Sequence, residues 1–223
     1  MPQRIRTLII VSILFFYNYA AYGEERMGQA RLFLGSTQIA PTELNTELTA
    51  QGLKKTDLNN LFGMEITFPF SDKLNSGLRY AKRIISEGGD ANGSLTTGYR
   101  GALDQDVAAF VGRYAFYKTE GVRLDVVLGI GGSNTNYKIK TATQDGSLTK
   151  TGSPFATLYS MGGISIAIGH GKYHFILEAG YDSQKVDGFE KAGNINNNVS
   201  SVDLSGPYLT IGLMFDGIPI SMK

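Results

Sequence analysis

Seven charged side chains interrupt stretches of the sequence in which large apolar residues otherwise alternate with small ones. They lie on the side of the alternation that carries glycine and alanine, opposite the Val, Leu and Ile side chains. The seven are Arg31, Glu65, Arg79, Arg113, Arg123, Asp125 and Glu178. Charges withdrawn from water are costly unless they pair, and four cations beside three carboxylates can pair. The residue types therefore predict a network of ion pairs rather than a reacting centre.

Sequence spacing indicates that these charges lie at a similar depth. If 118–120 form the loop of a hairpin, Arg113 lies opposite Asp125. A register shifted by two residues leaves the same two side chains diagonal, which is still within reach of a long side chain. Glu65 and Arg79 are placed in the same way across the preceding turn. We therefore expect contacts between neighbouring strands.

The sequence offers little for catalysis or metal binding. It contains two histidines, His170 and His174, and no cysteine. Neither a Ser-His-acid arrangement nor a Gly-x-Ser-x-Gly motif accompanies them. The stretches 88–94 and 104–106 lack the full spacing and the closing bidentate acid of a calcium loop. We expect no catalytic site, no metal site and no cofactor.

Eight runs with a period of two must position the charges, since this alternation is typical of strands with unlike faces. Short connections alternate with long polar ones, so the two kinds lie at opposite ends of the strands. In the first long connection, Pro41 and Gly52 are suited to the start and end of a short helix. The runs cover 29–35, 62–70, 77–84, 109–116, 121–132, 163–168, 173–182 and 208–215. The short connections are 71–75, 118–121 and 169–172, and the long ones are 38–60, 87–103, 133–153 and 183–201.

The small residues decide which face of the strands meets lipid. A soluble lipocalin-like ligand-binding barrel would expose glycines such as Gly129 and Gly163 to water, where glycine weakens a strand and packs nothing. The chain also has no Trp, so the Gly-x-Trp signature usual in lipocalins is absent. Runs of about 9–11 residues can cross a bilayer when they close into a barrel. Tyr173 and Tyr181 are spaced as two aromatic girdles require. We predict an all-β fold, an eight-stranded antiparallel up-and-down transmembrane β-barrel, with the lipocalin-like barrel as a minor alternative.

Closure of such a barrel places the strands that carry Arg31 and Glu178 on either side of the last strand. Two uses of the charge network are then open: a plug that fills the lumen, or a gate that opens it. We favour the plug, because side chains alone can fill the interior of an eight-stranded barrel.

The N-terminus reads as a secretory signal peptide. Arg4 and Arg6 precede an apolar run over 8–17, and small residues before position 24 suit cleavage after Gly23. We assign 1–23 to the signal peptide and 24–223 to one outer membrane β-barrel domain. The chain has 21 basic and 20 acidic residues without a basic block, so we expect no nucleic-acid partner.

Signal peptide, eight amphipathic strands, short turns, long loops and the absence of cysteine resemble the small bacterial outer membrane β-barrels of the OmpA/OmpX/OmpW type, within the porin superfamily. The resemblance implies export through the periplasm to the cell outer membrane, with short turns in the periplasm and long loops outside. It also implies a monomer in contact with outer membrane lipid and lipopolysaccharide. Members of this family usually end in an aromatic residue that the insertion machinery reads; here Phe215 is followed by 216–223. Either this extension is a periplasmic tail and Phe215 serves as an internal signal, or the signal is atypical.

The resemblance leaves the function open between two classes. One is a structural or interaction protein with at most a narrow gated pore, and the other is an OmpW-like channel for passive uptake of small solutes. Enzymes among outer membrane barrels, such as lipid A deacylases and omptin proteases, use histidine near the outer end. His170 and His174 fall at the turn end, so we expect no enzyme. The sequence names neither a solute nor a partner for the loops.

Overall fold

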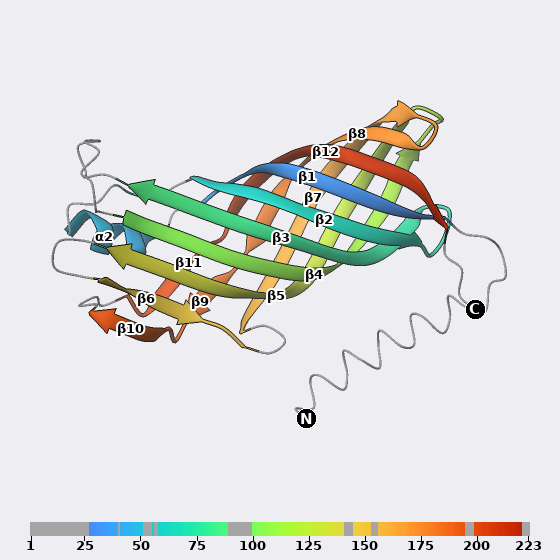
Figure 1. Cartoon of the computed structure of the whole chain (residues 1–223). Coiled ribbons are helices and arrows are strands. Elements are labelled where there is room, and N and C mark those ends of the chain that lie inside the picture. The colour runs from blue at the N-terminus through green and yellow to red at the C-terminus, as the bar shows by residue number, and fades with distance from the viewer. Residues whose placement is uncertain are drawn as a thin grey trace, which may run out of the picture.

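The computed structural model describes residues 27–39, 41–50, 55, 58–88, 100–140, 145–152, 156–194 and 199–219 (Figure 1). The predicted signal peptide, 1–23, lies outside the described residues. Eight strands pair antiparallel in chain order, and the last pairs with the first to close a barrel. They are β1 (Met27–Gln38), β2 (Leu58–Pro69), β3 (Leu74–Gly88), β4 (Arg100–Lys118), β5 (Val122–Lys140), β7 (Thr157–His170), β8 (Tyr173–Ser183) and β12 (Gly206–Pro219).

The barrel turns its large apolar side chains outward. On β5, Leu128 is 64% exposed while its neighbour Val127 is fully buried. Tyr173 and Tyr181 lie exposed near the two ends of β8. An apolar outer wall with aromatic residues at both edges is the surface of a transmembrane barrel. The predicted fold class is confirmed.

Tight turns join the strands at one end of the barrel, as predicted. At the first, the backbone N–H groups of Phe70 and Ser71 both donate to the carbonyl of Leu74. At the third, Gly171 has a φ of 64°, a left-handed conformation that glycine adopts without strain. We call this the turn end.

The opposite end, the loop end, carries more regular structure than expected. β6 (Asp145–Lys150) pairs with the loop-end part of β5, and β10 (Glu190–Asn194) pairs with β6. β9 (Lys185–Asp187) and β11 (Ser201–Asp203) form a separate two-stranded sheet. The expectation of long polar loops over 133–153 and 183–201 is wrong in this respect, because strands outside a membrane need no apolar outer face. The short helix expected in the first connection is present as α2 (Thr42–Ala50); within the described residues, no helix has the length and hydropathy to cross a membrane.

A second hydrophobic core lies at the loop end, and we call it the cap. It gathers side chains from α2, from the loop-end halves of β4 and β5, and from the small strands. Its members are Ile39, Leu48, Leu103, Tyr137, Ile139, Leu148, Val186, Val199, Val202 and Leu204, all at most 4% exposed.

The chain continues in regular structure after Phe215. β12 runs on to Pro219, which pairs with Met27, after a register shift at Gly28 and Gln29 of β1. The backbone N–H of Asp216 donates to Lys172 in the third tight turn at 2.8 Å. Of the two alternatives for this extension, the periplasmic tail is therefore wrong for 216–219, and 220–223 lie outside the described residues.

Candidate functional site

The candidate site is the charged centre, formed by the seven charged residues singled out in the sequence. The structure brings all seven together inside the barrel, and six of the eight barrel strands carry them. Pairing between strands sets part of the arrangement, since Arg31 lies opposite Glu65 and Glu65 lies opposite Arg79. All seven are at most 8% exposed: Arg31, Glu65, Arg79, Arg113, Arg123, Asp125 and Glu178.

Glu65 lies among three arginines. Its Oε2 accepts a hydrogen bond from Arg113 Nη2 at 2.8 Å and lies 3.6 Å from Arg79 Nη1. Its Oε1 accepts a second hydrogen bond from Arg113 Nε and lies 3.8 Å from Arg31 Nε. The paired geometry with Arg113 is the strong, directional form of an arginine–carboxylate contact.

Glu178 reaches the same arginines from the other side of the barrel. Its two oxygens accept hydrogen bonds from Arg79 Nη1 and Arg113 Nη2, each at 2.6 Å. The hydroxyl of Tyr208 on β12 donates a further bond at 3.2 Å. The guanidinium of Arg79 also lies 4.1 Å from the ring centroid of Phe33, a cation–π distance.

Asp125 closes the network toward the turn end. It accepts hydrogen bonds from Arg31 Nη2 at 3.1 Å and from Arg123 Nε at 2.6 Å. Arg31 Nη1 donates to the hydroxyl of Ser165 on β7 at 3.3 Å. With Ser165 and Tyr208, each of the eight barrel strands contributes a side chain to this level.

The pairing of β4 with β5 differs from the first of the two expected registers. Asp125 lies opposite Ala115, and Arg113 lies opposite Val127. The turn sets Lys118 opposite Arg123, three positions from that expected register, and a one-residue bulge between Ala115 and Tyr117 reduces the shift to two residues. Arg113 consequently binds the two glutamates, and Asp125 binds two other arginines.

The charged centre and a layer of apolar side chains on its loop-end side fill the lumen. Glu65 and Asp125 have no exposed surface, so no passage as wide as a water molecule reaches them. Toward the loop end the lumen is filled by apolar side chains, which we call the hydrophobic layer. Its members are Phe33, Leu61, Ala81, Val107, Ala109, Val111, Val127, Tyr159 and Met161.

Sequence reasoning missed a second buried ion pair, Arg83 with Asp182. Arg83 Nη2 donates to Asp182 Oδ2, and Arg83 Nη1 donates to the carbonyl of Leu204 at 3.3 Å. Alternation does place both charged side chains inward. Their positions on β3 and β8, which are not neighbours in the barrel, left no sequence signal that they meet.

The two histidines lie at the turn end, as predicted. His170 is exposed, and His174 Nδ1 lies 3.6 Å from Asp216 Oδ2. The described part of the chain contains no group of three His, Asp or Glu side chains that could hold a metal ion. The arrangement in the lumen pairs and buries charges, and neither histidine reaches it.

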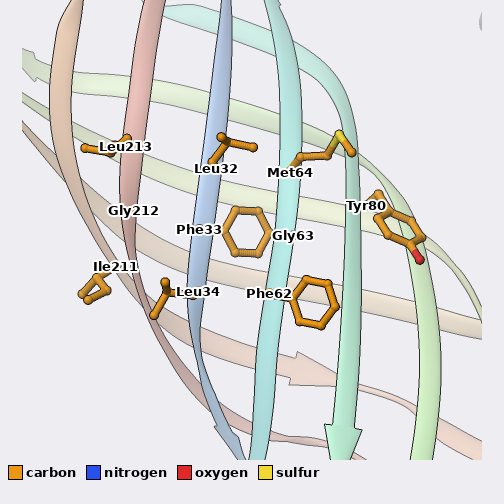
Figure 2. Close-up of a pocket in the computed structure, with 10 residues that line it drawn as sticks. All are labelled: Leu32, Phe33, Leu34, Phe62, Gly63, Met64, Tyr80, Ile211, Gly212 and Leu213. Atoms are coloured by element: carbon orange, nitrogen blue, oxygen red, sulfur yellow. The ribbon is translucent and has the colours of Figure 1, made fainter.

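A separate depression lies on the outer wall of the barrel, on β1, β2 and β12 (Figure 2). Its volume is about 430 Å³, and the outward side chains of Leu32, Leu34, Phe62 and Met64 surround it. It is apolar and belongs to the lipid-facing wall. It is therefore no part of the charged centre.

No protein-family model matches the chain, and no curated protein does so either. Solved structures do match. Ail, the attachment invasion locus protein of Yersinia pestis, in complex with the heparin analogue sucrose octasulfate, matches with a TM-score of 0.48 and 13% identity over 86% of this chain and 99% of that chain. Neisserial surface protein A matches with a TM-score of 0.49 and 10% identity over 85% and 96% of the two chains. The outer membrane protease OmpT of Escherichia coli matches with a TM-score of 0.42 and 10% identity over 86% and 94%. At identities this low the matches concern the fold alone, so any function has to be argued from the chain's own residues.

Proposed function

We propose that this chain is an integral protein of the bacterial outer membrane with a structural or interaction role. Its barrel conducts at most through a narrow, gated path. The observation that carries the proposal is the complete burial of Glu65 and Asp125 in the middle of the lumen. A barrel that held an open channel would leave such carboxylates in water. The role of the charged centre is then to hold the barrel closed and to join its strands.

The two ends of the barrel differ in which compartment they face. β1 begins and β12 ends at the turn end, where Met27 pairs with Pro219. Export through the periplasm, as the predicted signal peptide implies, leaves this end in the periplasm and the loop end outside the cell. α2, β6 and β10 are then the surfaces offered to extracellular partners. Outer membrane lipid and lipopolysaccharide surround the apolar wall.

Conductance across a planar lipid bilayer tests the proposal. We expect the purified wild-type barrel, inserted at single-molecule density, to give no steady current above the protein-free bilayer. Swelling of vesicles in small neutral solutes should likewise match protein-free vesicles. A steady open current, or rapid swelling, would contradict the closed barrel and favour a channel for passive uptake of small solutes.

A further inference from the structure

A ring of polar side chains lies inside the barrel, between the hydrophobic layer and the cap. Strand pairing brings its members together in two groups, since Thr37 lies opposite Asn59, and Gln105 lies opposite both Arg83 and Thr135. Asp182 joins the second group through its ion pair with Arg83. All of them are at most 2% exposed. We call them the polar ring: Thr37, Asn59, Arg83, Gln105, Thr135, Asp182 and Gln184.

The polar ring lies at the loop-end edge of the lipid-facing wall. Lys82, Asp106 and Asn134 are paired across three adjacent strands and face outward, where the outer wall turns from apolar to polar. Arg83 and Gln105 are their direct chain neighbours and face inward. The ring therefore lies at headgroup level, close to water, although nothing reaches it in this conformation.

Many polar atoms of this ring have no hydrogen-bond partner in the described structure. A buried polar group without a partner is unfavourable compared with the same group in water. These atoms find no partner among the protein groups, and a water molecule or a hydrogen-bonding solute beside them would supply one. The atoms are Thr37 Oγ1, Asn59 Oδ1, Asn59 Nδ2, Arg83 Nε, Gln105 Oε1, Asp182 Oδ1 and Gln184 Oε1.

The cover over the ring is held by few directional contacts. β9 and β11 continue the β8–β12 hairpin past the barrel in the same register, and the Leu204 N–H donates to the Gln184 carbonyl at 2.9 Å between the two ladders. Glu43 of α2 accepts two exposed hydrogen bonds from Ser201 of β11, at 3.2 and 3.1 Å. Arg83 Nη1 donates to the Leu204 carbonyl at 3.3 Å, and Lys150 Nζ donates to the Gly188 carbonyl at 3.2 Å. The cap adds apolar contacts, among them those of Val202 and Leu204. Local opening is favoured where exposed hydrogen bonds and few backbone ladders hold a segment.

We infer that the β9–β11 pair is a lid over a polar vestibule. When the lid lifts, water and small hydrogen-bonding solutes enter from the loop end and solvate the polar ring. They stop at the hydrophobic layer, whose members offer them the Tyr159 hydroxyl alone; the Ser133 hydroxyl, opposite Val107, already accepts a hydrogen bond from Gln184. This inference goes beyond the proposed function, because it holds whether or not the charged centre conducts.

Cysteine accessibility tests the lid directly, because the chain has no cysteine of its own. We would label folded protein in lipid vesicles with a membrane-impermeant maleimide. Lys138→Cys, exposed at the loop end of β5, gives the rate of an open site. Gln105→Cys should react about 10- to 1,000-fold more slowly, because minor conformations are typically populated at roughly 0.1–10%. Val111→Cys, inward on the same strand but in the hydrophobic layer, should not react.

A second substitution shows that the lid controls access. Val202→Ala, which thins the cap under the lid, should raise the labelling rate of Gln105→Cys at least severalfold. Val126→Ala, the same change on the lipid-facing wall, should leave that rate unchanged. Thr135→Cys on the adjacent strand replaces Gln105→Cys if the latter fails to fold.

Two results would overturn the lid. If the polar-ring cysteines, like Val111→Cys, do not react at all, the ring is sealed. If the polar-ring cysteines and Val111→Cys both react, and at equal rates, the whole barrel opens and there is no separate lid.

Discussion

Replacing Glu65 by glutamine is the sharpest perturbation of the charged centre, because this carboxylate lies beside three cations. Its oxygens lie 2.8 Å from Arg113 Nη2, 3.6 Å from Arg79 Nη1 and 3.8 Å from Arg31 Nε. Glutamine keeps the size of the side chain and one acceptor oxygen, so the change removes charge with little loss of packing. The four arginines then face two carboxylates instead of three.

The expected loss of stability follows from these distances. Opposite unit charges 4 Å apart attract by about 4 kcal/mol at an effective dielectric constant of about 20. The summed attraction of three such contacts is larger than the net contribution of Glu65 to the free energy of unfolding. Much of that attraction is offset by the cost of burying the carboxylate in the folded wild type. Removing one partner of a buried pair typically costs about 3–5 kcal/mol, and Glu65 has no solvent exposure that would weaken its contacts. We expect Glu65→Gln to lower the free energy of unfolding by about 3–5 kcal/mol in urea titrations in lipid vesicles.

Glu43→Gln is the matched control, since Glu43 is exposed on α2 and lies outside the barrel. We expect that change to stay within about 1 kcal/mol, as surface substitutions usually do. Adding Arg113→Met to Glu65→Gln removes one of the underpaired cations and should recover part of the loss. If Glu65→Gln unfolds like Glu43→Gln, Glu65 is not a buried, ion-paired carboxylate and the account of the charged centre fails.

Three further substitution experiments test the orientation and packing of the strands. Leu128→Arg on the lipid-facing wall should destabilise the inserted barrel by about 2–4 kcal/mol if it lies near the bilayer midplane; unchanged stability in vesicles would argue against a lipid-facing wall. In intact cells, an impermeant maleimide should label Lys138→Cys but not Lys118→Cys, and the reverse pattern would invert the proposed topology. Gly180→Ala should lower the urea midpoint, because its Cβ would lie 2.3 Å from the Gly162 carbonyl oxygen, whereas Gly112→Ala, with no atom within 4 Å, should be tolerated; equal midpoints would contradict the close approach of β7 and β8.

Alternation made the barrel predictable from the sequence. On β5 the side chains from Val122 to Ile130 alternate between two surroundings, and a shift by one residue would turn Leu128 into the lumen and Asp125 into lipid. The cost of placing an aspartate in lipid therefore determines which face of the strand points into the lumen. The glycines opposite the large apolar residues identified the inner face for the same reason, since a crowded lumen needs small side chains.

Alternation could predict neither the register between β4 and β5 nor the small strands at the loop end. A shift by two residues keeps every side chain on its own face, so alternation could not distinguish Ala115 from Arg113 as the partner of Asp125. The register is set by the turn together with a one-residue bulge between Ala115 and Tyr117, and at the bulge both Phe116 and Tyr117 face outward, each 50% exposed. Outside the membrane, strands such as β6 have no apolar outer face, and their sequence reads as a polar loop. The contact of Arg83 with Asp182 joins strands that are not neighbours, which no local pattern encodes.

In the proposed closed barrel, side chains fill the lumen at several levels, and this bears on what a gate could be. Buried charges occupy the centre, Val111 and Val127 with no exposed surface fill the hydrophobic layer, and the cap covers the polar ring. These closures act in series, so a path through the barrel needs all of them to open together. Rearranging the ion pairs alone leaves the hydrophobic layer in place, and lifting the lid alone exposes only the polar ring. Access from the loop end and conduction through the barrel are therefore separate events, and a stimulus that moves the lid need not open a pore.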